Sequence, residues 1–78
     1  MYLHQLKLNT KAKIVKINLG HSVRERLHSM GVIEGIDIVP RKKVPLRGPR
    51  IYEIMNTSLA IRNDIARKIQ IKTPNEKE

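Results

Sequence analysis

The sequence contains no cysteine, phenylalanine or tryptophan, and only two tyrosines, in 78 residues. The lack of cysteine excludes disulfides, thiolate metal sites and a cysteine nucleophile, and it is compatible with a reducing compartment. We therefore expect a cytoplasmic protein. Because only Tyr2 and Tyr52 could stack on bases, the chain is poorly equipped as a platform for single-stranded nucleic acid.

Acidic residues and long apolar runs are also scarce. Seven Asp and Glu against sixteen Lys and Arg give a net charge of +9, which favours an acidic partner surface, a phosphate backbone or anionic lipid. Lysines also keep a small β-rich protein soluble and protect its sheet edges. No apolar run approaches the roughly 20 residues that cross a bilayer, and the first residues lack the apolar core of a signal peptide. We expect neither membrane insertion nor export by that route.

The best-defined element is a helix predicted over residues 22–30. Ser22 and Glu25 have the spacing of a capping box, and Gly31 supplies the left-handed residue that ends a helix. One arc of the helix is apolar and comprises Val23, Leu27 and Met30. A helix shorter than about 12 residues is marginal in water by itself, so this one must dock on a sheet.

The rest of the chain has the pattern of short strands separated by turns. The expected strands are residues 11–18, 36–44, 51–55, 59–62 and 69–71. The alternation changes phase at Ile14 and Val15, which predicts a bulge in the first strand, and Pro40 predicts an edge or bulge in the second. Residues 2–8 are expected to form a strap across the core.

Two further local motifs complete the expected fold. Residues 56–58 predict a turn in which Asn56 is the residue most tolerant of positive φ, and Asn63 is expected to cap a single helical turn. We predict one domain over residues 1–73, followed by a flexible tail at 74–78. The fold class is all-β, β-rich with one short helix, and the architecture is a small, partly closed barrel of five antiparallel strands.

A proline-rich loop over residues 45–50 joins the second and third expected strands. A hairpin brings the two arms of such a loop within a Debye length of about 8 Å, so the fields of their cations add. Leu46 is either an exposed anchor or a residue buried beneath the loop. The candidate partner-binding residues are Arg41, Lys42, Lys43, Leu46, Arg47 and Arg50.

Residues with catalytic or metal-binding potential are few and poorly spaced. His21 and His28 would lie about 10 Å apart along a helix, too far to share one ion. The serines lack a recognisable base and acid, and the glycines at 31 and 35 lack the Lys-Ser/Thr of a P-loop. We expect no catalytic residue, no cofactor and no metal site, and therefore no enzyme.

Several motifs, none of them specific alone, follow one another along most of the chain. They are Arg26-Leu27, Met30-Gly31, Gly35, Pro45-Leu46, Pro49, Leu59 to Arg62, Ala66 and Ile69 to Ile71. In this order and spacing they resemble the ferrous iron transport protein A (FeoA) family. The resemblance implies an SH3-like barrel. It also implies an accessory cytoplasmic protein that binds FeoB, an Fe(II) permease with a cytoplasmic G domain, and regulates or stabilises it.

The chain departs from that family in the basic loop, which in the family usually reads Pro-Leu-Gly-Asp-Pro. Here Arg47 and Gly48 occupy the Gly-Asp positions, so an acid is lost and a cation is gained. We therefore expect the matching partner surface to be acidic.

Other interpretations stay open. The net charge of +9 favours a small nucleic-acid-binding β-barrel, against which the shortage of aromatics argues. A stand-alone SH3-like metalloregulator module is another alternative, because a similar barrel occurs in iron-dependent repressors of the diphtheria-toxin-repressor type. A self-assembling scaffold is suggested only by exposed strand edges, which lysines oppose. The residues predict neither the oligomeric state nor the direction of any regulation.

Overall fold

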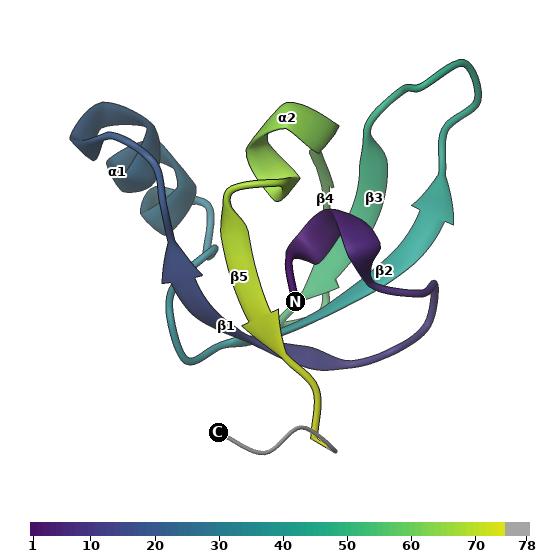
Figure 1. The fold of residues 1–78 in the computed structure, drawn as a ribbon, viewed down its shortest axis with the longest axis horizontal. Helices are drawn as coiled ribbons and strands as arrows, with labels where there is room; N and C mark the ends of the chain where they lie inside the picture. Colours follow the sequence, from purple (N-terminus) through teal and green to yellow (C-terminus); the bar gives the residue numbers. More distant parts are fainter. Residues whose placement is uncertain (75–78) are drawn as a thin grey trace.

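The computed structural model describes residues 1–74 and consists of one antiparallel sheet that curls around a core (Figure 1). The five strands follow the spatial order β4-β3-β2-β1-β5. Their bounds are β1 (Ala12–Ile17), β2 (Asp37–Lys43), β3 (Arg50–Ile54), β4 (Thr57–Ile61) and β5 (Ile69–Lys72). The helices are the 3-10 turn η1 (Leu3–Gln5), α1 (His21–Ser29) and the single turn α2 (Asn63–Ala66). The predicted five-stranded, mostly β architecture with one short helix is confirmed.

The hydrophobic core fills the inside of this curled sheet and draws on every strand. Alternation along β3 is the clearest case, because positions 50, 52 and 54 are buried while 51 and 53 are only partly covered. Tyr52 is fully buried, and its burial raises the pKa of its hydroxyl, which the neighbouring Arg50 guanidinium opposes. Of the two tyrosines, only Tyr2 has a ring exposed to solvent.

The N-terminal strap predicted for residues 2–8 is confirmed. Leu3 and Leu6 are buried in the core, whereas Leu8 is exposed. The Met1 carbonyl accepts a hydrogen bond of 2.8 Å from the N–H of Ile71, and Tyr2 forms a bridge with Gln70. The strap therefore protects the outer edge of β5. Most of the tail predicted for 74–78 lies outside the described residues.

Both predicted bulges are present and bend their strands. The register between β1 and β5 shifts between Ile14 and Lys16, and the register between β2 and β3 shifts between Pro40 and Lys42. The extra residue lets Ile14 point into the core while Val15 stays 45% exposed. These shifts supply the curvature that closes the sheet over its own face.

The start of α1 differs from the prediction. The helix begins at His21, the N-cap is Gly20, and the first helical hydrogen bond runs from the N–H of Arg24 to the Gly20 carbonyl at 2.9 Å. Ser22 therefore lies inside the first turn, where it cannot act as the cap, and the Glu25 carboxylate pairs with the His21 ring instead. The predicted capping box is wrong.

The end of α1 follows the prediction. Gly31 has φ +94°, its N–H donates to the His28 carbonyl, and the N–H of Val32 donates to the Leu27 carbonyl at 2.9 Å. This is the Schellman pattern, which satisfies the last carbonyls of a helix. Val32 is fully buried, whereas Met30 is 47% exposed. The expectation that Met30 packs inward is wrong because the turn at Gly31 brings Val32 to the core in its place.

The turns around β4 also differ in detail from the predictions. Met55 (φ +48°) and Asn56 (φ +64°) form a two-residue hairpin turn, so Asn56 has the expected backbone but Thr57 already belongs to β4. The helical turn after β4 is present, but its N-cap is Arg62. The cap predicted for Asn63 is wrong, because the Asn63 side-chain amide donates to the Gly48 carbonyl at 3.4 Å.

Candidate functional site

The loop between β2 and β3, residues 44–49, extends beyond the sheet and is called the basic loop here (Figure 1). At its base Lys43 and Arg50 face each other across the ladder. Its tip is a tight turn in which the N–H of Gly48 donates to the Pro45 carbonyl at 3.3 Å. The two central residues of this turn, Leu46 and Arg47, both have positive φ, at 61° and 60°.

Glycine, asparagine and aspartate usually occupy such positions, since a left-handed backbone costs other residues about 1–3 kcal/mol. The basic loop therefore stores strain in two residues with long side chains. Gly48 is needed there for space, because an added Cβ would lie 2.7 Å from Val44 Cγ1. The Asn63 amide holds the loop against α2 through the Gly48 carbonyl.

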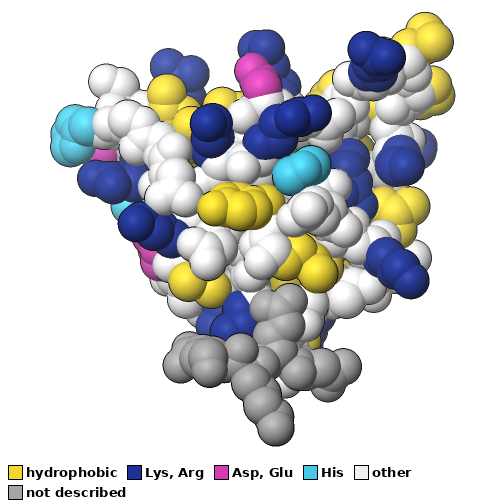
Figure 2. Space-filling model, in the orientation of Figure 1, with side chains coloured by type: hydrophobic (Ala, Val, Ile, Leu, Met, Phe, Trp, Pro, Cys, Tyr) yellow, Lys and Arg dark blue, Asp and Glu magenta, His cyan; other side chains and the backbone are white. Residues whose placement is uncertain are grey.

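Leu46 is 99% exposed at the tip of the basic loop. The sequence left exposure and burial of this side chain as alternatives, and the structure places it in solvent. Figure 2 shows hydrophobic and basic side chains together at the end of the molecule where the loop projects. An apolar side chain beside cations is typical of a protein-binding anchor with a polar rim.

Arg50 was expected to contact a partner at the surface, but it is buried. Its side chain is only 6% exposed, and its guanidinium lies 5.6 Å from the centre of the Tyr52 ring. Arg50 Nη2 donates to the Leu6 carbonyl at 2.6 Å and Nη1 donates to the His4 carbonyl at 3.1 Å. Arg50 therefore ties the N-terminal strap to the base of the loop. The sequence contained a signal for this burial, because Arg50 is in phase with Tyr52 and Ile54, which point inward from the same strand.

The other candidate cations are divided between two places. Arg41 lies at the β2 bulge, where its Nε donates to Glu53 at 2.7 Å and its Nη1 donates to Asn9 at 3.0 Å, so it is locally paired. Lys42 and Lys43 are exposed on the arm of the loop, and Arg47 is exposed at its tip. The structure thus brings Lys43, Arg47 and Arg50 together and separates Arg41 from them.

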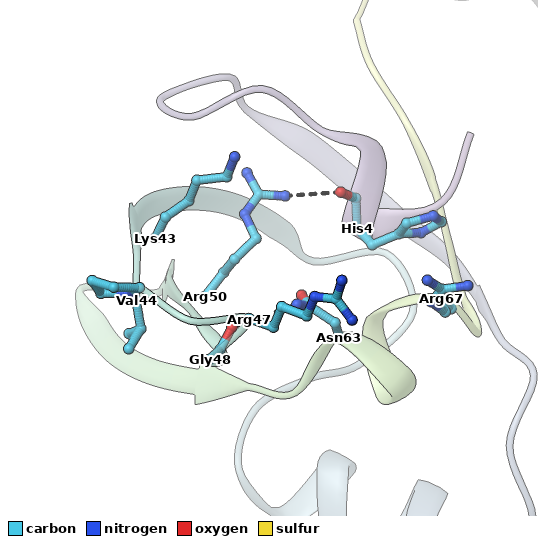
Figure 3. Close-up of a pocket in the computed structure, with 9 residues that line it drawn as sticks. His4, Lys43, Val44, Arg47, Gly48, Arg50, Asn63 and Arg67 are labelled. Carbon is cyan, nitrogen blue, oxygen red and sulfur yellow. Dashed lines mark hydrogen bonds between the residues drawn. The ribbon is translucent and has the colours of Figure 1, made fainter.

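A cavity of about 500 Å³ lies between the basic loop, η1 and α2 and is called the basic pocket here (Figure 3). Its polar lining comprises His4, Lys43, Arg47, Arg50, Asn63 and Arg67. Sequence reasoning missed three of these, His4, Asn63 and Arg67, because they come from segments distant in the chain. Within residues 1–74, no carboxylate forms an ion pair with any of its four Lys and Arg side chains.

The protonation of His4 is affected by its burial and by the cations around it. Burial lowers the pKa of His4 below its ordinary value, and the nearby charges of Arg67 and Arg50 lower it further. The imidazole therefore favours its neutral form in the basic pocket.

The other two histidines lie at α1 and have carboxylate partners. His21 pairs with Glu25, and His28 Nε2 lies 3.0 Å from Glu34. The Glu34 carboxylate accepts a hydrogen bond from the backbone N–H of Glu34, and this bond lowers the pKa of the carboxyl most. Desolvation raises this pKa by a smaller amount, and the contact with His28 lowers it. In the described part of the chain, no three His, Asp or Glu side chains converge on a position that could hold a metal ion. Within the same residues, no helix has the length and apolar character required to cross a membrane.

The family model for the FeoA domain matches residues 1–73. A curated relative is the Fe(2+) transport protein A/Fe(2+) transporter FeoB fusion protein of Porphyromonas gingivalis, which is 32% identical over 72 residues. That match covers 92% of this chain but only 8% of the fusion protein.

Solved structures share the fold over nearly the whole chain. Iron(II) transport protein A from Clostridium thermocellum is 26% identical with a TM-score of 0.89, and the match covers 95% of this chain and 46% of that one. FeoA of Stenotrophomonas maltophilia, solved with zinc and described as a prokaryotic SH3 domain protein, is 24% identical with a TM-score of 0.78. Its match covers 92% of this chain and 89% of that one. The predicted SH3-like barrel is confirmed.

Proposed function

Because this chain belongs to the FeoA domain family, we propose that it is a cytoplasmic accessory protein of ferrous iron uptake that binds a FeoB-type permease. It acts by binding, not by catalysis, and it regulates or stabilises the permease. Residues 1–73 form the binding module, and the basic loop is its contact surface.

The fusion protein of P. gingivalis supports the choice of partner. In that relative, Fe(2+) transport protein A and the transporter FeoB are parts of one polypeptide. Joining two modules in one chain raises the effective concentration of one for the other, commonly to the millimolar range. A permanent link of this kind is most useful when the two modules work on each other.

The exposure of Leu46 is the single observation that carries the choice of surface. A 99% exposed leucine, held at the tip by a strained turn beside Arg47, has no role in the core of this domain. Within residues 1–74, Arg47 forms no ion pair with a carboxylate. Anchors of this kind supply a large share of interface free energy, and surrounding cations select an acidic partner and accelerate encounter.

The test is binding of the purified chain to the cytoplasmic domains of the cognate FeoB-type permease, measured by calorimetry. We expect Leu46→Asp to raise Kd at least tenfold, since a buried anchor contributes about 2 kcal/mol or more. Met55→Asp is a matched control, because Met55 is also an exposed apolar residue at positive φ in a tight turn. Aspartate tolerates that backbone at both sites, so both variants should fold.

A charge reversal tests the electrostatic part of the same interface. Arg47→Glu should weaken binding and reduce its dependence on salt, whereas Arg26→Glu on α1 should leave both nearly unchanged. If Leu46→Asp and Arg47→Glu bind as the unmodified chain does, the basic loop is not the contact surface.

A further inference from the structure

The basic pocket gathers cations from four separate elements around one cavity. Lys43 ends β2, Arg47 lies in the basic loop, Arg50 begins β3 and Arg67 follows α2. Like charges repel, and a fold that places them side by side without acids lowers its own stability. We propose that this pocket is a binding site for a phosphate-class oxyanion.

Arg50 is the strongest argument for an anion at this position. Its guanidinium is almost fully buried, and a buried cation costs several kcal/mol unless it is compensated. Two backbone carbonyls accept from its Nη atoms, but Nε is buried without a partner, and within residues 1–74 no carboxylate pairs with it. An anion in the adjoining cavity supplies the missing negative charge.

The surrounding groups are arranged as further donors. Arg47 extends from the basic loop toward Asn63, and Arg67 lies beside His4 on the other side of the cavity (Figure 3). His4 Nδ1 is a second buried polar atom at this cavity that lacks a hydrogen-bond partner among the described residues. Guanidinium groups suit oxyanions because they present paired N–H donors in one plane.

Charge favours phosphate over a carboxylate. A phosphate monoester carries about −1.5 to −2 at neutral pH and has three strong acceptor oxygens, while a carboxylate carries one charge on two oxygens. Four Lys and Arg side chains line the cavity and no acid among residues 1–74 does so, so a single carboxylate would leave most of their charge unbalanced. A diphosphate presents more charge and more acceptor oxygens than a single phosphate, and the pocket offers cations both on the loop and after α2.

The pocket shares Arg47 with the proposed contact surface, but anion binding can be tested on the isolated chain, without the protein partner. Inorganic phosphate and diphosphate would be titrated against the ¹⁵N-labelled protein at constant ionic strength, with succinate as the carboxylate probe. We expect saturable shifts centred on the basic pocket, and diphosphate binding at least tenfold tighter than succinate. The pKa of His4, followed by its ring signals, should rise because the anion offsets the fields of Arg50 and Arg67.

A matched pair of double variants decides whether the pocket is specific. Arg47→Gln with Arg67→Gln should weaken diphosphate binding at least tenfold. Lys16→Gln with Arg26→Gln removes the same charge from exposed positions away from the pocket and should leave Kd within twofold. All four residues are exposed, so both variants should fold.

Three results would overturn the proposal: shifts that rise linearly without saturation, equal weakening by both double variants, or succinate binding as tightly as diphosphate. The first two would mean general screening of a basic surface. The last would mean that the pocket is a carboxylate receptor, and a peptide rich in Asp and Glu would then bind the same residues.

Discussion

Helix α1 and the basic loop lie at opposite ends of the molecule (Figure 1), and both carry several cationic or titratable side chains. They differ in which titratable groups have an acidic partner. On α1, His21 and His28 each lie against a glutamate. Around the basic loop, the cations that line the pocket have no acidic partner within residues 1–74.

The two regions also differ in backbone strain. Where α1 ends, the left-handed position is Gly31, which adopts it at little cost. At the tip of the loop, the left-handed positions are Leu46 and Arg47, which adopt it at a cost. The chain thus has a backbone cost at the loop tip that it avoids at the end of α1, and local violations of this kind are common at functional sites.

The largest expected effect concerns the base of the loop. Arg50→Met should lower the free energy of unfolding by about 3 kcal/mol, because the His4 and Leu6 carbonyls lose charged donors. Arg26→Met on exposed α1 should change it by less than about 0.5 kcal/mol. Urea unfolding followed by circular dichroism measures both. A loss below about 1 kcal/mol for Arg50→Met would show that burying the cation nearly cancels its hydrogen bonds.

Two substitutions at positions with positive φ should change stability in different ways, because one adds a side chain at such a position and the other removes one. Gly31→Ala should destabilise the protein by about 1–2 kcal/mol, because an added Cβ has room but φ is +94°. Leu46→Gly should leave stability unchanged or raise it by up to about 1 kcal/mol, since relief of strain outweighs the extra freedom of glycine in the unfolded chain. Thermal unfolding compares the two. Destabilisation by Leu46→Gly would argue against strain in the loop.

Acidification should affect the two regions in different pH windows. His4 has a lowered pKa, so the unfolded chain binds its proton more readily, and stability falls as pH drops below the ordinary value of 6.5 toward the folded pKa. Glu34 also has a lowered pKa, so its contribution is present above 4.5 and is lost as pH falls through its folded pKa.

Urea midpoints measured from pH 8 to 3 separate the two groups. His4→Gln should flatten the profile near pH 6, and Glu34→Gln should flatten it only below pH 4.5. If His4→Gln leaves the pH dependence of stability near pH 6 unchanged, another group causes that dependence.

The smallest effect is expected from the paired charge on α1. Glu25→Gln removes the carboxylate that contacts His21, both of them largely exposed, and should change stability by about 0.5 kcal/mol or less. It should leave binding at the basic loop unaltered. The unfolding measurement used for Arg50→Met serves here as well, and a change above about 1 kcal/mol would mean that α1 depends on this pair.

Much of the fold could be predicted because it rests on local, periodic signals. Alternation placed the strands, a phase change at Ile14 and a proline at position 40 marked the bulges, and Gly31 marked the end of α1. The start of α1 could not be predicted in the same way, since its N-cap is Gly20, which is extended and has no side chain that could mark the position by a capping hydrogen bond.

The candidate site was only partly predictable. The basic loop stands out in the sequence because prolines and glycine mark it. The exposure of Leu46 stayed open, since a leucine between prolines could also be buried beneath the loop. Arg50 was misplaced because its charge was weighed above the period-two alternation it shares with Tyr52. His4, Asn63 and Arg67 carry no sequence signal for a shared pocket, because they meet only after the strap and α2 pack beside the loop.

By itself, then, the sequence determined a small basic β-barrel with a bulged first strand, a glycine-terminated helix and a proline-framed basic loop. Each of these features depends on the backbone preferences of a few adjacent residues. Tertiary structure decided which charges are paired, because that depends on distances between segments far apart in the chain. It turned Arg50 inward, left Leu46 in solvent and gathered around one cavity four cations that have no carboxylate partner among the described residues.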